Sequence, residues 1–220
     1  MQAINHVATA LILKRKFPET PLFGLIIATE AVEYLWVTLN LLGVEKTIVS
    51  DPMKTVADVH LVHMPFSHSI ATSAVFAIVA GLIVLWMGRS NAIAMAVALS
   101  LAIFSHIVLD LVVHAPDIAL LPFFSGIKLG SGLYSNWPLM AFGIETLWGV
   151  MCWWVYRGSG PLLVLILGFS IVSLPVYSVA IDGGETVLAG HDTAFVLLIL
   201  AQVLGTSVML WLFARRTGNV

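Results

Sequence analysis

Six long apolar stretches, separated by short polar or Gly/Pro-containing breaks, constrain the fold of this chain more than any other feature of its sequence. They cover approximately residues 22–42, 67–87, 92–113, 137–156, 162–181 and 194–213. Each has the roughly 20 residues that a helix needs to cross a hydrocarbon core about 30 Å thick, where backbone groups find no water to bind. The sequence therefore predicts an all-α, polytopic membrane helix bundle of about six spans.

The composition agrees with a membrane domain and argues against a soluble one. Hydrophobic residues make up 60% of the 220 residues and charged residues only 10%, whereas soluble domains carry about 25% charged residues. We interpret residues 1–220 as a single integral-membrane domain, because no repeat, linker or low-complexity tract divides the chain. The net charge of -2 offers no basic surface, so nucleic acid is excluded as a partner and the bilayer is the expected one.

The first apolar segment, residues 3–13, is too short to cross a bilayer. It would be only about 16 Å long at a rise of 1.5 Å per residue, and we expect a half-inserted or interfacial helix. The basic triplet Lys14-Arg15-Lys16 follows this segment. A cleavable signal peptide carries its charge before the apolar region, so none is expected.

Basic residues indicate how the bundle is oriented, since they concentrate in cytoplasmic connections. One side of a six-span arrangement carries Lys14, Arg15, Lys16, Arg89, Arg157, Arg215 and Arg216. The other side carries Lys46, Lys54 and Lys128. This bias predicts a bundle with both termini near the cytoplasmic side. The segments 43–66, 114–136 and 182–192 would then lie outside the cytoplasm.

Four carboxylates lie within the predicted spans, namely Glu30, Glu33, Asp110 and Glu145. An ionised group at the centre of a span costs roughly 2.5–3.5 kcal/mol, so such residues are functional candidates by default. Glu30 and Glu33 share a helix face. His106, Asp110 and His114 recur every fourth residue and form a second polar stripe. Each group has a structural alternative, either a network with Tyr34 or a polar contact that joins helices.

The remaining histidines cluster near the same stripes. His60, His63 and His68 precede the second span, and His6 lies in the short first segment. Imidazole and carboxylate groups together suit Zn²⁺, Mn²⁺ or Fe, and a mixed set is typical of catalytic sites. One ion takes three or four such ligands, and six or more would indicate two ions. His60 is more typical of a surface residue, and the roles of Glu145, His114 and Asp117 stay open.

Several of these elements occur in an order that is known from one protein family. The chain shows Asn5-His6, then Glu30 and Glu33, then HMPFSHS at residues 63–69, then SHIVLD at residues 105–110. This arrangement resembles the YdjM-like inner-membrane metal-dependent hydrolases of bacteria over about the first 125 residues. The family usually has an acidic Pro-Asp-x-Asp element where this chain has Glu30 and Glu33, and Met64 and Pro65 replace its Arg and Gly. The resemblance implies a metal-dependent hydrolase and no defined substrate.

The leading hypothesis is a membrane-embedded, metal-dependent hydrolase whose site opens to the extracytoplasmic side. The expected metal ligands are His6, Glu30, His68, His106 and Asp110, holding a divalent ion, Zn²⁺ first and Mn²⁺ or Fe as alternatives. Glu33 is the expected general base, and His63 is either a proton carrier or a group that supports a metal ligand. The ligand and base roles are exchangeable between Glu30 and Glu33. A lipid-like substrate, such as a phospholipid or isoprenoid phosphate, suits the location.

Two other functions use the same residues. A transporter or channel for protons, metal ions or small solutes would employ the intramembrane acids and histidines as relay groups or transient ligands. A structural membrane protein would use the polar stripes only to join helices.

Overall fold

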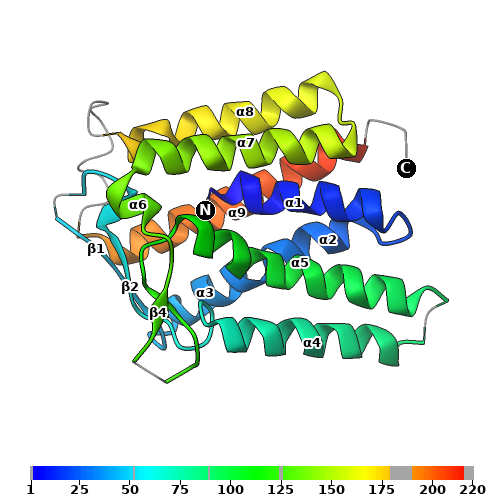
Figure 1. Cartoon of the computed structure of the whole chain (residues 1–220), viewed down its shortest axis with the longest axis horizontal. Coiled ribbons are helices and arrows are strands. Elements are labelled where there is room, and N and C mark those ends of the chain that lie inside the picture. Colours follow the sequence, from blue (N-terminus) through cyan, green and yellow to red (C-terminus); the bar gives the residue numbers. More distant parts are fainter. Residues whose placement is uncertain (1, 52, 89, 124–125, 179–189, 216–220) are drawn as a thin grey trace.

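The computed structural model describes residues 2–51, 53–88, 90–123, 126–178 and 190–215, and it is mainly helical (Figure 1). Its α-helices are α1 (Ala3–Lys16), α2 (Leu22–Thr29), α3 (Ala31–Leu41), α4 (Ile70–Trp86), α5 (Ala92–Val113), α6 (Leu133–Asn136), α7 (Pro138–Tyr156), α8 (Gly160–Ser173) and α9 (Asp192–Ala214). The two short 3₁₀ helices are η1 (Val56–Asp58) and η2 (Leu174–Tyr177). Two small antiparallel pairs join β1 (Lys46–Val49) to β2 (Val59–His63), and β3 (Ile118–Ala119) to β4 (Lys128–Leu129).

The helices confirm a polytopic membrane bundle, but with fewer clear spans than the sequence predicts. Within the described residues, four helices are long and apolar enough to cross a membrane, and a fifth span results if α2 and α3 count as one. These two helices are bent by 46° at Glu30. The helix α4 is apolar but has only 17 residues. The predicted count of six is therefore not confirmed, because one apolar run is broken and another is shortened.

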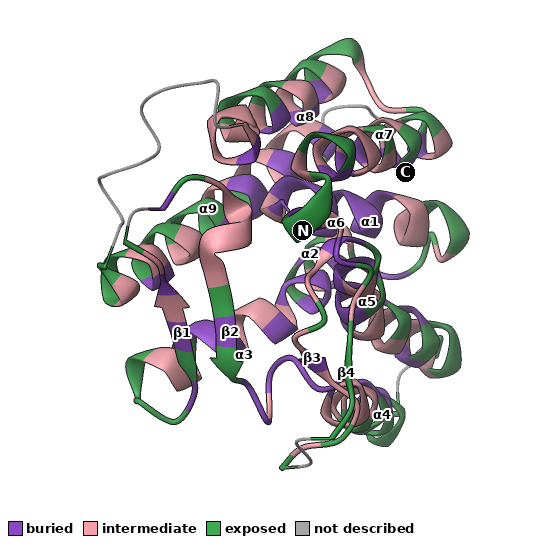
Figure 2. Cartoon of the chain, turned by 60° about the vertical axis from the view of Figure 1, so that its left-hand side comes forward, coloured by how far each residue is buried: buried purple, intermediate pink, exposed green. Residues whose placement is uncertain are grey.

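The short helix α1 lies at the centre of the bundle. It packs against α2, α5, α7 and α9, and all of its residues from 4 to 11 are buried (Figures 1 and 2). This burial corrects the interfacial alternative for the segment. Its apolar residues Ile4, Val7 and Leu11 belong to the central apolar cluster together with residues of the surrounding helices. Although it cannot span a bilayer, α1 is therefore the core around which the longer helices pack.

Two ends of the bundle differ in charge. The α1–α2, α4–α5 and α7–α8 connections and the end of α9 lie at the right-hand end in Figure 1, and the β-strands and α6 lie at the left-hand end. Basic residues close α1, α7 and α9 at the right-hand end, with Lys16, Arg157 and Arg215 at or next to the helix ends. Arg89, Arg216 and most of the acidic segment 182–192 lie outside the described residues.

The N-terminal end of α1 does not share the basic end of the bundle. Gln2 is buried, and its backbone N–H donates to Glu145 Oε2 at 2.7 Å. The start of α1 therefore lies at a different level along the helices from the ends of α1 and α9 (Figure 1).

Candidate metal centre

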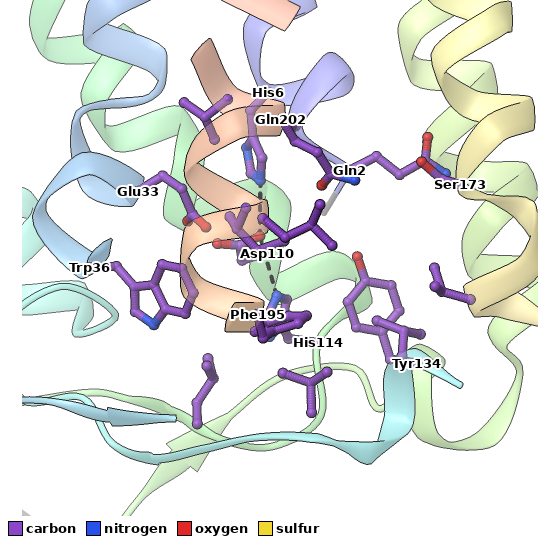
Figure 3. Close-up of a pocket in the computed structure, with 18 of the residues that line it drawn as sticks. Gln2, His6, Glu33, Trp36, Asp110, His114, Tyr134, Ser173, Phe195 and Gln202 are labelled. Atoms are coloured by element: carbon purple, nitrogen blue, oxygen red, sulfur yellow. Dashed lines mark ion pairs between the residues drawn. The ribbon is translucent and has the colours of Figure 1, made fainter. Parts of the chain in front are cut away.

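Asp110 lies among the imidazole rings of four histidines. Its Oδ1 is 3.2 Å from His6 Nε2 and 3.6 Å from His114 Nε2. Its Oδ2 is 3.4 Å from His106 Nε2 and 3.6 Å from His68 Nε2. Figure 3 shows His6 and His114 on opposite sides of this carboxylate. Asp110 is buried, as are all of these histidines except His114, which is half-buried.

The helix α5 and the residue that follows it supply three of these residues. His106, Asp110 and His114 follow one another at intervals of four residues, as the sequence indicates. The helix ends at Val113, and His114 has an extended backbone with φ -64° and ψ 155°. Its ring nevertheless faces Asp110. The third member of the stripe therefore belongs to the loop that leaves the helix.

Glu33 on α3 completes a ring of four potential ligand atoms. Its Oε2 is 3.4 Å from His106 Nε2 and 3.9 Å from His68 Nε2. With Asp110 Oδ2, the neighbouring nitrogen and oxygen atoms around this ring are thus 3.4–3.9 Å apart. Ligand atoms of one tetrahedral Zn²⁺, bound at about 2.0–2.1 Å, lie roughly 3.3–3.4 Å from one another. The donor set and its spacing fit a divalent metal ion.

A backbone carbonyl orients the ring of His106. The carbonyl oxygen of Thr29, at the bend between α2 and α3, lies 2.8 Å from His106 Nδ1. Because a carbonyl only accepts, Nδ1 carries the proton, and the other ring nitrogen faces the carboxylates without a proton of its own in the neutral ring. Metal-binding histidines usually have such a partner on the second nitrogen.

His68 is oriented by a chain of two side chains that the sequence analysis did not identify. Ser67 Oγ donates to Glu45 Oε2 at 2.5 Å and lies 2.9 Å from His68 Nδ1. Since the hydroxyl proton goes to the carboxylate, Ser67 Oγ accepts from Nδ1 and leaves Nε2 directed at Asp110 and Glu33. Glu45 is buried and also accepts the backbone N–H groups of Phe66 and Ser67. No motif marks Glu45, because it follows a span in a connecting segment.

Burial lowers the pKa of His68 below its usual value, against the raising effect of the carboxylates of Asp110 and Glu33. A lowered pKa keeps this imidazole neutral near pH 7. The neutral ring is the form that binds a metal ion.

Removing the Ser67 hydroxyl is expected to weaken metal binding without abolishing it. The variant Ser67→Ala leaves His68 Nδ1 without its acceptor, and loss of such an orienting partner typically costs about 10–100-fold in metal affinity. Competition with a metal-binding dye measures the change. Ser100→Ala is the control, because this hydroxyl donates to the Ala77 carbonyl between α4 and α5. Equal affinities for the two variants would contradict the orienting role of Ser67.

Two residues that the sequence predicts for the site, Glu30 and His63, do not contact the imidazole cluster. Glu30 is fully buried and lines the same cavity, and neither of its carboxylate oxygens makes a hydrogen bond within the described chain. Glu33, and not Glu30, contacts the imidazoles. His63 is exposed on β2 opposite Lys46 and is absent from the cavity lining. The strand carries its ring to the outer surface, away from the cluster that begins five residues later.

Glu145 is part of a second buried polar group. Its carboxylate accepts from Tyr134 Oη at 2.6 Å, from Tyr177 Oη at 3.2 Å and from the Gln2 backbone. Burial, together with the Glu145 carboxylate, raises the pKa of Tyr134 well above its usual value. This tyrosine therefore stays protonated and donates its hydrogen bond. Glu145 thus holds the start of α1 beside the cavity.

The cluster opens into a cavity of about 310 Å³ that polar and apolar side chains line together. Its polar lining includes Gln2, His6, Glu30, Glu33, His68, Asp110, His114, Asp117 and Tyr134. Apolar residues of α8, η2 and α9 also line it, namely Phe169, Val172, Val176, Phe195, Leu198, Ile199 and Val203, beside the polar Ser173, Gln202 and Thr206 of α8 and α9. Figure 3 shows how the polar side chains converge. Such a combination accommodates a molecule with a polar head and an apolar tail.

Two overlapping groups of side chains have ligand atoms within 4.8 Å of one another. One is His6, His106 and Asp110, and the other is Glu33, His68 and His106. The chain's one cysteine, Cys152, is buried on α7 in the apolar core around α1. The candidate centre is therefore built from imidazole and carboxylate groups alone, within the described residues.

Comparison with known proteins identifies the family of this chain. The model of the YdjM inner membrane protein family matches residues 7–182, a stretch that includes Glu33, His68, His106 and Asp110. Neither the curated proteins nor the solved structures gave a match. The family match covers more than half of the chain and confirms the resemblance seen in the motifs. The chain is an integral membrane protein that belongs to the YdjM inner membrane protein family.

Proposed function

We propose that this protein is a metal-dependent hydrolase that cleaves a phosphoester in an amphipathic lipid. The observation that supports it most is the ring of Glu33, His68, His106 and Asp110, which converge from three separate segments. Burying such groups is costly unless they serve a function or bind an ion. A divalent ion bound there would supply Lewis acidity towards the phosphate oxygens.

The side chains divide into holding and proton-transfer roles. His68, His106, Asp110 and Glu33 hold the ion, and the carbonyl of Thr29 and the Ser67–Glu45 pair orient the two rings. Glu30 lies in the same cavity with no hydrogen bond to its carboxylate from the described residues. It is the assigned general base that accepts a proton from the attacking water. These assignments exchange the roles that the sequence predicts for Glu30 and Glu33.

The apolar part of the cavity lining supports a lipid substrate. Val172 on α8 and Leu198 on α9 line the cavity and are 76% and 41% exposed. In a bilayer, exposed apolar residues of spanning helices contact lipid tails. An acyl chain between α8 and α9 would place its head group among the polar residues.

The distribution of basic residues supports an extracytoplasmic opening. Lys16, Arg157 and Arg215 close helices at one end of the bundle, and the strands and α6 lie at the other end (Figure 1). The cytoplasmic side is usually the basic one. We assign the end with the strands to the extracytoplasmic side, and with it the mouth of the cavity.

Phosphate release from lipid vesicles tests the proposal. The full chain, purified in detergent and loaded with Zn²⁺, is expected to release phosphate from phosphatidic acid in phosphatidylcholine vesicles, and much more slowly from glycerol phosphate, which has no apolar tail. His106→Ala should be inactive and should hold less metal than wild type. The matched control His60→Ala should behave as wild type, because His60 is exposed on β2 and bonds to Ser50.

Two outcomes would overturn the proposal. A metal-loaded protein without phosphate release from either compound would contradict the hydrolase function. Flux of protons or Zn²⁺ into liposomes that is lost in Glu33→Gln, without hydrolysis, would support the transporter instead.

A further inference from the structure

We infer that Asp110 bridges two metal ions, and that the second ion is held by Asp110 Oδ1, His6 and His114. This inference rests on the proposed function, because the first ion is the one bound at Asp110 Oδ2. The second site takes a divalent cation with imidazole and carboxylate ligands, such as Zn²⁺ or Mn²⁺.

The two oxygens of Asp110 have separate partners. Oδ2 faces His68 and His106, whereas Oδ1 faces His6 at 3.2 Å and His114 at 3.6 Å. One ion takes three or four side chains at a tetrahedral site. Glu33, His68, His106 and Asp110 already supply four. A second ion on Oδ1 gives the other two imidazoles a shared partner.

His114 is oriented as a metal-binding histidine. Its Nε2 faces Asp110, and its Nδ1 lies 3.6 Å from Asp117 Oδ1. A carboxylate behind the second ring nitrogen fixes the ring and increases its basicity as a ligand. Asp117 also lines the cavity, so both residues are near the space through which an ion would enter.

The chain holds His114 in place although it lies outside the helix. Its carbonyl accepts the backbone N–H of Gly132 at 2.8 Å, and Ser131 N–H donates to Leu111 O at 3.0 Å. Gly130 has φ +151° and lies against the carbonyl of Ala115, where a Cβ atom would collide. This close approach ties the returning loop to the end of α5 and sets the position of the ring.

His6 reaches the site from the opposite side. The core helix α1 carries it, and the ring stacks on His106 with 3.8 Å between centroids and 7° between planes (Figure 3). The parallel rings thus present Nε2 atoms to different oxygens of one carboxylate. Two ions about 3.5–4 Å apart are a common arrangement in enzymes that cleave phosphoesters, which agrees with the proposed substrate.

Metal stoichiometry and electron paramagnetic resonance test the inference on the full chain in detergent. After chelation and titration with Zn²⁺, elemental analysis should find two ions in wild type and in the control His60→Ala, and one in His114→Ala. Wild type loaded with Mn²⁺ should give the spectrum of a spin-coupled pair. This measurement does not depend on the folding of any variant. His114→Ala should give the signal of an isolated Mn²⁺.

The outcomes separate the two proposals. One ion in wild type, no spin coupling and an unchanged content in His114→Ala would overturn the bridging role while leaving the first site intact. Wild type without any bound ion would overturn both.

Discussion

Asp110→Asn is expected to lose its bound metal, with an affinity at least about 100-fold lower than that of wild type, and with it all phosphate release. The carboxylate has one imidazole pair at each oxygen. Asparagine has nearly the same shape, but its amide replaces one oxygen by a hydrogen-bond donor and removes the charge. Loss of an orienting partner alone costs roughly 10–100-fold, so loss of the central ligand should exceed that range. Elemental analysis and the vesicle assay measure both effects.

The control for this variant is a second aspartate outside the cavity. Asp51 is exposed and does not line the cavity, so Asp51→Asn should retain the metal content and activity of wild type. A wild-type metal content in Asp110→Asn would show that the ion, if any, binds elsewhere. That result would remove the basis for both proposals.

Gly149→Val is expected to lower the free energy of unfolding by about 1–3 kcal/mol through overpacking of the core. Gly149 on α7 is buried where α1 and α8 meet it, and a Cβ atom there would collide with Asn5 Oδ1 and lie 2.8 Å from Ile166 Cγ2. The bulkier side chain must push α1 away from α7. Because α1 carries His6, metal binding should fall together with stability. Chemical or thermal unfolding in detergent measures the loss.

Gly143→Val is the matched control for the packing effect. Gly143 lies on the same helix, and a Cβ atom there meets nothing within 4 Å. Both variants change helix propensity alike, so the difference between them reports packing against α1. Equal stabilities would contradict the central position of α1.

Several parts of the structure follow from local sequence. A run of about 20 apolar residues predicts a helix that suits a bilayer, because the backbone must satisfy its own hydrogen bonds there. The helices α5, α7 and α9 agree with this reasoning. The polar cluster was also predictable from the sequence. Acids and histidines inside apolar runs are costly to insert into a membrane, so their presence indicates a function. Spacing placed His106, Asp110 and His114 on one face without knowledge of the fold.

The general position of the site was thus predictable, but its internal assignments were not. Glu30 and Glu33 are three residues apart, and the bend between α2 and α3 decides which of them meets the histidines. Glu45 carries no sequence signal, because its role depends on Ser67, 22 residues away. His63 and His68 look alike in one short motif. The strand β2 exposes the first, while the turn before α4 buries the second.

Hydropathy and helical spacing act over neighbouring residues, so they suffice to predict a helical membrane protein with acids and histidines inside its apolar runs. Long-range packing was needed to show that α1 is the core, how many helices remain unbroken, and that Asp110 contacts four imidazoles. An apolar residue has the same hydropathy whether it faces lipid or another helix, so hydropathy cannot distinguish the surface of a membrane protein from its core. Contacts between His6 and Asp110 join residues over 100 positions apart, and only packing brings them together.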